Sequence, residues 1–407
     1  MEGQSPSSPI RASEPCSVGV QSFRLDHDQI DEYLKNGVLV VDNVLTECEL
    51  QEAKNGLLKS LQTRGIQSFD VEDEESALAF QKLSSTNGSG GVLDIFHDNW
   101  KLKLIATHPK LFSITQQLWK TGYNCGGNNK DSLPEDLRFQ WHPFGGDLDF
   151  ENKGFCYIDR VGYRLPTELA QEWGSRIHKR NTGIASTSKK KKKLCSVQRS
   201  LTPHLDCCPD TLYENTNKWR PIQCFVSLTD NLEANTGGFE AALGGFHHTF
   251  DQWAKSRINE ATTTDHSTTA ERKPAPCLGE YTHIRPKEDA DVMKRVCHIS
   301  VKAGSAVFWD NRIPHANAYR NDHKYLARAV VYASFLPDIA LNRRYVKNQL
   351  RAWKLRQPIR DQWNHIPGEE DKKEEEIPCS DGDQQLSSVD GDIFTDLGKR
   401  LMGIEPW

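Results

Sequence analysis

Four short apolar runs, separated by connections of very different length, limit most strongly what this chain can fold into. The runs are FCYIDRVGYRL (155–165), PIQCFVSL (221–228), SAVFWD (305–310) and RAVVYASF (328–335). Runs of this length that are rich in Val, Ile, Phe and Tyr are typical of β-strands. Their connections lack the regular alternation of strand and helix that builds a parallel sheet. We therefore expect a mostly β protein with flanking helices (α+β), in which the strands form a jelly roll.

Helices are predicted on both sides of these strands. Residues 26–37 (DHDQIDEYLKNG) begin with an aspartate suited to an N-cap, carry apolar residues on one face and end in glycine. Thr46–Glu49 has the capping-box pattern that opens a helix. A third helix is predicted to begin at Pro109, and a basic amphipathic helix is expected over 339–356.

Composition indicates that only part of the chain builds the core. Hydrophobic residues make up 37%, yet the 10 Trp and 16 Phe exclude a wholly disordered chain. We expect one folded domain with decorations: a disordered leader at 1–22, the domain at 23–366 with polar insertions at about 167–199 and 251–295, an acidic linker at 367–390, and a short C-terminal element at 391–407.

Charge and cysteine content exclude several classes of protein. The net charge of −5 is not the strongly basic balance of a nucleic-acid-binding domain. The sequence has neither a long apolar run that would span a membrane nor a secretory signal. Its 11 cysteines are odd in number and form no C-x-x-C pair, so we expect reduced thiols. A cytoplasmic protein is predicted, with an organelle or the nucleus left open.

The candidate site begins at the segment Pro203–Asp206. On a strand, His204 and Asp206 point to the same face and can hold one metal ion. Alone this pattern is weak, since about two His-x-acid tripeptides are expected by chance in a chain of this composition. His315, which follows the apolar run 305–310, completes the two-histidine, one-carboxylate set that holds non-haem iron(II).

Arg328 adds the second half of the signal. The iron set leaves three coordination positions open, of which a 2-oxo acid can chelate two and dioxygen can take the third. A 2-oxo diacid also has a distal carboxylate, and the planar fork of a guanidinium suits it. Arg328 lies on the strand after His315 and is well placed for this role.

Five segments resemble the phytanoyl-CoA dioxygenase family of iron(II)- and 2-oxoglutarate-dependent oxygenases. The segments are IDEYLKNGVLVVDNVLTECEL, PHLDCCP, RPIQCFVSLTDNLEANTGGFEAALGGFHHTF, GSAVFWDNRIPHANA and ARAVVYASFLPD. Together they cover most of 26–340, with the two insertions outside. The resemblance implies a double-stranded β-helix (jelly-roll, cupin-like) core, with His204, Asp206 and His315 as iron ligands. It also implies that Arg328 anchors 2-oxoglutarate and that Asn317 helps to hold it.

Two positions depart from the family pattern. Leu205 stands where some relatives have Gln, which removes one contact to the 2-oxo acid. Gly244–His247 replaces a Pro-Gly-Ser-His turn, so that turn is expected to have another shape.

The resemblance implies a dioxygenase that hydroxylates a small organic or acyl substrate and releases succinate and CO₂. Its cofactors would be Fe(II) and 2-oxoglutarate, with ascorbate as a reductant. Dioxygen would be a second substrate, and no nucleic acid is expected as a partner. Two alternatives stay open: a non-catalytic binding or scaffold protein of the same fold, and a nucleic-acid-associated oxygenase that uses the run Lys189–Lys193.

Other residues receive plainer interpretations. The run Lys189–Lys193 is interpreted as a solvated loop, with a nuclear signal or a loop at the site's mouth as alternatives. Cys207 and Cys208 are expected to be small buried apolar residues. Neither His247 nor His248 is required for the metal. Tyr163 and Arg164 are weak candidates for lining the pocket.

Overall fold

A large antiparallel sheet lies at the centre of the fold. The computed structural model describes residues 23–359 and 393–407, except for 128, 146–147, 149, 151, 186–187, 210–215 and 263–280. Within these residues, six strands form the larger sheet, in the order β1 (Val38–Val41), β11 (Ala306–Asp310), β7 (Ile222–Ser227), β13 (Arg328–Pro337), β5 (Gly154–Arg164) and β2 (Val92–Leu93). The four predicted strands are β5, β7, β11 and β13.

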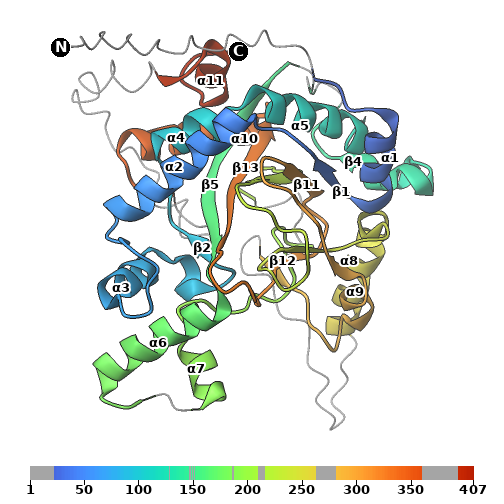
Figure 1. Cartoon of the computed structure of the whole chain (residues 1–407). Helices are drawn as coiled ribbons and strands as arrows, with labels where there is room; N and C mark the ends of the chain where they lie inside the picture. Colours follow the sequence, from blue (N-terminus) through green and yellow to red (C-terminus); the bar gives the residue numbers. More distant parts are fainter. Residues whose placement is uncertain are drawn as a thin grey trace, which may run out of the picture.

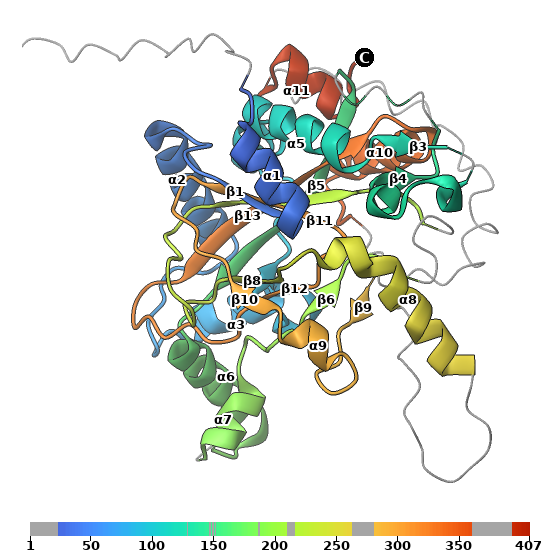
Figure 2. The same cartoon turned by 90° about the vertical axis from the view of Figure 1, so that its right-hand side faces the viewer.

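A smaller antiparallel sheet faces it (Figure 2). Its described strands lie in the order β10 (Val296–His298), β8 (Phe239–Ala242), β12 (His315–Asn317), β6 (His204–Leu205) and β9 (Thr282–His283). Leu205 and Phe239 from this sheet pack in one apolar cluster with Phe225, Trp309 and Val330 from the larger sheet. The candidate site residues therefore lie on strands whose positions are fixed by the core between the two sheets.

Helices cover the opposite face of the larger sheet (Figure 1). They include α1 (His27–Asn36), α2 (Glu47–Thr63), α5 (Pro109–Gly122), α10 (Ala340–Lys354) and α11 (Asp396–Leu401). Alternation along a strand directs neighbouring side chains to opposite faces. On β13, accordingly, Val330 packs between the sheets while Val331 packs in the cluster beneath the helices. The structure thus confirms antiparallel sheets flanked by helices, and the jelly-roll path of the chain stays a prediction.

The predicted helix starts are confirmed by their caps. Asp26 accepts a hydrogen bond from the backbone N–H of Gln29 at the start of α1. Thr46 and Glu49 form a reciprocal capping box at the start of α2. Gly37 ends α1 at φ 69°, and a Cβ there would lie 2.7 Å from Ile313 Cδ1. Glycine therefore permits both the left-handed turn and the close approach to the segment that precedes His315.

The first insertion is a helical hairpin, so the interpretation of its lysine run as a loop was wrong. The hairpin consists of α6 (Thr167–Thr182) and α7 (Lys189–Cys195), which lie together at the lower edge of the molecule (Figure 1). The Ser188 hydroxyl caps α7 by accepting from the backbone N–H of Lys191. A Cβ on Gly174 would lie 1.8 Å from the Cys195 carbonyl oxygen, so the two helices meet closely because residue 174 is glycine.

The second insertion begins within α8 (Phe246–Thr262) and ends after the short helix α9 (Ala290–Met293). Sequence reasoning also missed α3 (Glu74–Leu83). The remaining elements are short: Ser85–Gly88, Asn99–Lys101 (α4), Leu102–Ala106, Lys130–Ser132, Glu135–Gln140, and the parallel pair β3 (Cys125–Gly126) and β4 (Trp141–His142). The predicted leader at 1–22 and linker at 367–390 lie outside the described residues.

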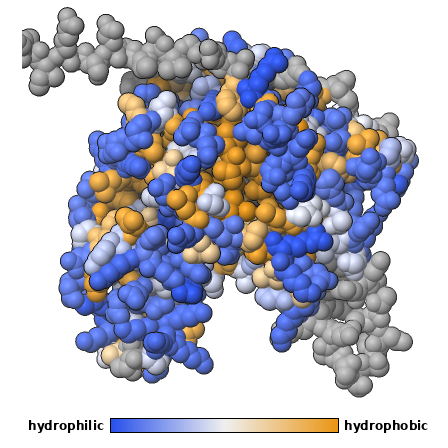
Figure 3. Space-filling model, turned by 45° about the vertical axis from the view of Figure 1, so that its right-hand side comes forward, coloured by the Kyte–Doolittle hydropathy of each residue, from blue (hydrophilic) through white to orange (hydrophobic). Residues whose placement is uncertain are grey.

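Hydrophobic residues on the face drawn in Figure 3 gather in a band across its middle, with mostly hydrophilic residues on either side. In the described part of the chain, no helix has both the length and the apolar character needed to cross a membrane.

Candidate metal centre

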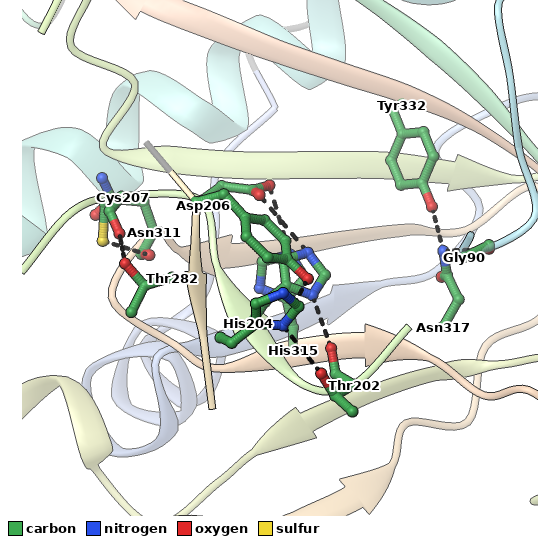
Figure 4. Close-up of polar contacts among 12 residues, drawn as sticks. Gly90, Thr202, His204, Asp206, Cys207, Thr282, Asn311, His315, Asn317 and Tyr332 are labelled. Atoms are coloured by element: carbon green, nitrogen blue, oxygen red, sulfur yellow. Dashed lines mark hydrogen bonds and ion pairs between the residues drawn. The ribbon is translucent and has the colours of Figure 1, made fainter. Parts of the chain in front are cut away.

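Two histidines and one aspartate converge between β6 and β12, as the sequence predicted. His204 on β6 lies directly opposite His315 on β12 in the antiparallel register. Asp206 follows β6 immediately. One ligand atom from each of the three residues lies within 4.8 Å of the others, and the side chains point toward one another (Figure 4). This is the only such group of three or more His, Cys, Asp or Glu side chains in the described residues.

Backbone carbonyls fix the orientation of both imidazoles. His204 Nδ1 lies 3.1 Å from the Thr202 carbonyl oxygen, and His315 Nδ1 lies 2.9 Å from that of Ile313. A carbonyl only accepts, so each Nδ1 must carry the proton, and Nε2 keeps its lone pair. The Nε2 atoms lie 3.6 Å (His204) and 3.7 Å (His315) from the carboxylate oxygens of Asp206. Both free lone pairs therefore face the point where a metal would bind.

The protonation states of two ligands suit a cation. Burial, followed by the neighbouring His315, lowers the pKa of His204 to about 4, so its imidazole is neutral near pH 7. Burial alone would raise the pKa of Asp206, but its contacts with His315 and His204 and the positive charge of Arg220 hold that pKa below its usual range. The site thus offers a neutral imidazole and an ionised carboxylate, the forms that bind metals.

Arg220 holds the aspartate and was not found from the sequence. Its Nη2 lies 3.5 Å from Asp206 Oδ2, and its Nη1 lies 3.2 Å from Asp159 Oδ2. The guanidinium carbon also lies 4.6 Å from the centre of the Tyr157 ring. Asp159 and Tyr157 come from β5 of the larger sheet. The carboxylate ligand is therefore tied to the larger sheet through one arginine.

Aromatic rings surround the two histidines. The Trp309 and Phe239 rings lie 5.1 and 5.8 Å from the His315 ring. The Tyr281 ring stacks on His204 at 4.8 Å, with an interplanar angle of 28°. All three aromatic residues are buried. Such a shell keeps bulk water from the ligands and fixes their rotamers.

Arg328 and Asn317, the two residues predicted to hold 2-oxoglutarate, contact each other. Arg328 is the first residue of β13 and is 3% exposed. Its Nη1 donates to Asn317 Oδ1 at 2.8 Å. Asn317 Nδ2 donates in turn to the Gly90 carbonyl and to the Tyr332 hydroxyl (Figure 4). Asn317 is two residues beyond His315 on β12, so both side chains share one face of the strand.

The rest of the Arg328 guanidinium is buried without a partner. Its Nε and Nη2 have no hydrogen-bond partner in the described residues. A buried donor without a partner costs about 1–3 kcal/mol, and more when it is charged. A carboxylate ligand would accept from both groups at once. The residue thus fits the role of a carboxylate anchor.

Two cysteines and two further histidines that the sequence analysis considered are not among the three converging residues. Cys207 keeps its thiol, which donates to the Asn311 carbonyl oxygen. Cys208, by contrast, is disulfide-bonded, which corrects the expectation of reduced thiols at that position. His247 and His248 lie on α8, where each ring contacts the Leu34 carbonyl oxygen, and neither joins the metal ligands.

Comparisons with known proteins show the fold and leave the family open. No family model matches the chain, and no curated protein matches it either, so the resemblance to phytanoyl-CoA dioxygenases stays a prediction. Among solved structures, the chain is similar to GlcNAc Inducible Gene 2, GIG2 (DUF1479), from Candida albicans. That match has 14% identity and a TM-score of 0.54, and covers 95% of this chain and 78% of that chain.

It is similar in the same way to the hypothetical protein JW0805 from Escherichia coli, with 12% identity, a TM-score of 0.55, and coverage of 93% and 81%. The matches also include HygX from Streptomyces hygroscopicus, solved with nickel and 2-oxoglutarate bound, at 10% identity, a TM-score of only 0.38, and coverage of 78% and 88%. The chain therefore shares a fold with the first two proteins, and its function must be argued from its own site.

Proposed function

We propose that this chain is an Fe(II)- and 2-oxoglutarate-dependent oxygenase of the phytanoyl-CoA dioxygenase type. One observation carries the proposal: the ligand atoms of His204, Asp206 and His315 converge, and the buried Arg328, which donates to Asn317 two residues beyond His315, has donors without a partner. Two imidazole nitrogens and one carboxylate form the facial set that suits non-haem iron(II) and leaves positions open for other ligands.

Bound iron and 2-oxoglutarate supply the activation of dioxygen that oxidises a substrate C–H bond, with release of succinate and CO₂. The residues of the chain would bind the iron and 2-oxoglutarate, orient them and shield them from water. His204 and His315 present Nε2 because the carbonyls of Thr202 and Ile313 hold their Nδ1 protons. Arg328 offers Nε and Nη2 to the distal carboxylate, while Asn317 holds the third nitrogen in place.

Several finer predictions belong to this proposal. The two facing sheets form a double-stranded β-helix, built from a single oxygenase domain at 23–366. The substrate is a small organic or acyl compound, ascorbate serves as reductant, and nucleic acid is not a partner. The protein works in the cytoplasm.

Succinate production tests the proposal. The full chain is incubated with Fe(II), 2-oxoglutarate, ascorbate and dioxygen, and succinate is measured with and without candidate acyl substrates. The wild type should form succinate, and His204→Ala should form none above the background without enzyme. His283→Ala is the matched control, because His283 is the Cα partner of His204 on β9 and is not a metal ligand.

Equal succinate formation by wild type and His204→Ala would overturn the proposal. It would favour instead a binding or scaffold protein that uses the three residues structurally.

A further inference from the structure

A second buried guanidinium lies beside Arg328. Arg164 is the last residue of β5, and it is the Cα partner of Arg328, the first residue of β13. Directly opposed residues of an antiparallel pair project from the same face of the sheet. Arg164 is 1% exposed and Arg328 is 3% exposed. Two cations are thus buried side by side on the face that looks into the space between the sheets.

The described residues supply no carboxylate to either cation within ion-pair distance. Arg164 Nη1 and Nη2 both donate to the Arg199 carbonyl oxygen, at 3.2 and 3.3 Å. Its Nε is buried without a hydrogen-bond partner among the residues described, as are Nε and Nη2 of Arg328. Burial, followed by the charge of Arg328, lowers the pKa of Arg164 only to about 10, so the group stays charged near neutral pH.

One glycine turn borders both arginines. The Gly90 carbonyl accepts from Asn317, which itself holds Arg328. A Cβ on the next residue, Gly91, would lie 3.2 Å from Arg164 Nε. Gly91 has φ 70°, which also favours glycine. The unpartnered Nε of Arg164 and the Asn317–Arg328 pair therefore both lie next to the backbone of this turn.

Two buried like charges without a counter-ion are strongly unfavourable, and a bound anion removes most of that cost. A single carboxylate accepts up to four hydrogen bonds, enough to satisfy donors from two guanidinium groups. The distal carboxylate of a 2-oxo diacid is the anion already assigned to this end of the site.

We propose that Arg164 is a second anchor for the distal carboxylate of 2-oxoglutarate and acts together with Arg328. This inference rests on the proposed function, because it takes 2-oxoglutarate as the ligand. It makes the cosubstrate pocket selective for a 2-oxo acid with a second negative charge.

Binding of two cosubstrates that differ in one group tests this role. The iron-loaded full chain is titrated by calorimetry without dioxygen, first with 2-oxoglutarate and then with 2-oxopentanoate, which has a methyl group in place of the distal carboxylate. Arg164→Gln should lower the affinity for 2-oxoglutarate about tenfold or more, which is the loss expected for hydrogen bonds to a charged group. Binding of 2-oxopentanoate should change by less than about twofold, and Arg164→Lys should fall between wild type and Arg164→Gln.

Gln198→Leu is the matched control for damage to the end of β5. The Gln198 side chain accepts from the Leu165 N–H and donates to the Tyr163 carbonyl, on either side of Arg164. Its loss perturbs the same strand end and keeps the guanidinium. If this variant loses affinity at all, it should therefore lose it by the same factor for 2-oxoglutarate and for 2-oxopentanoate.

The inference would be overturned if Arg164→Gln lost affinity equally for both acids, or if it bound 2-oxoglutarate as well as the wild type. Arg164 would then be a structural residue. If Arg164→Gln does not fold, the ratio of the two affinities in Arg164→Lys decides by the same criterion. The outcomes also separate the two proposals. If only Arg328→Gln selectively loses affinity for 2-oxoglutarate, the role of Arg164 is overturned and the proposed function is not. If the wild type binds neither acid, the proposed function is overturned as well.

Discussion

At the scale of single residues, the candidate metal centre depends as much on the groups that orient its three side chains as on those side chains themselves. The two histidines are oriented by backbone carbonyls, which no substitution at those positions removes. Asp206 is held by a side chain, Arg220, and Arg220 by Asp159. The carboxylate ligand is therefore the one whose support a single substitution can take away.

Arg220→Gln is expected to weaken metal binding by about 10- to 100-fold, the usual effect of losing a residue that orients a ligand. The dissociation constant for Co(II), measured by competition with a chelator, checks this expectation. Arg160→Gln is the control, since Arg160 lies on β5 beside Asp159 and forms its ion pair with Asp94, at 2.7 Å. Equal losses in the two variants would show that Arg220 acts only through general stability.

The convergence of the candidate ligands was predictable from the sequence, and the residues that support them were not. His204, Asp206, His315 and Arg328 follow one another along the chain in the order that one kind of site requires. An arginine such as Arg220 pairs with whichever carboxylate tertiary packing brings near, so no local pattern indicates its partner. The pairing of Arg164 with Arg328 likewise depends on the register of β5 against β13.

At the scale of elements, helix α2 carries a pH-sensitive cap. The hydrogen bond from His108 lowers the pKa of Glu49 most; burial opposes it, and the Thr46 backbone N–H lowers it further, to about 2. A carboxyl whose folded pKa is depressed stabilises the fold above its unfolded value, near 4.5, and loses that contribution as the pH falls toward 2.

Glu49→Gln is therefore expected to lower the free energy of unfolding by about 0.5 kcal/mol near pH 6, a small value because the side chain is partly exposed. The gap between variant and wild type should close as the pH falls toward 2. Urea unfolding at several pH values measures it. Glu47→Gln, in the same first turn, serves as the charge control. A gap that stays constant across this range would contradict the role of the ionised carboxyl.

Elements with strong local signals were found, and elements defined by tertiary contacts were not. Caps at Asp26 and Thr46 and the apolar stripe of α10 are local features, and the structure confirms all three. The lysine run gave no apolar periodicity, yet it forms α7 because α6 packs against its end through Gly174. Strand β6 was expected from the His-x-Asp pattern, but it has only two residues, His204 and Leu205, and its place in the sheet is set by its partners β9 and β12.

At the scale of the whole molecule, the larger sheet separates two apolar clusters, one toward the metal centre and one beneath the helices. The C-terminal segment closes the second cluster. Leu401 and Met402 are fully buried there, and Trp407 Nε1 donates to the Gly154 carbonyl oxygen at the start of β5.

Leu401→Ala is expected to lower the free energy of unfolding by about 2–5 kcal/mol, as for other large-to-small changes in a core. Arg400→Ala, one residue earlier and exposed, should change it by less than about 0.5 kcal/mol. Denaturant unfolding measures both. Metal affinity should stay unchanged in both variants, because the segment lies on the face of the sheet away from the metal centre. No loss of stability in Leu401→Ala would mean that this helix is not part of the core.

The most direct test of the central claim is the number and affinity of Fe(II) ions bound by the full chain without dioxygen, in wild type, His315→Ala and His283→Ala. Convergence of His204, Asp206 and His315 predicts one tightly bound ion per chain in the wild type and in His283→Ala. His315→Ala should bind Fe(II) about 100-fold more weakly, because it loses one of three ligands. A wild type that binds no Fe(II), or a His315→Ala variant that binds it as tightly as the wild type, would contradict the account.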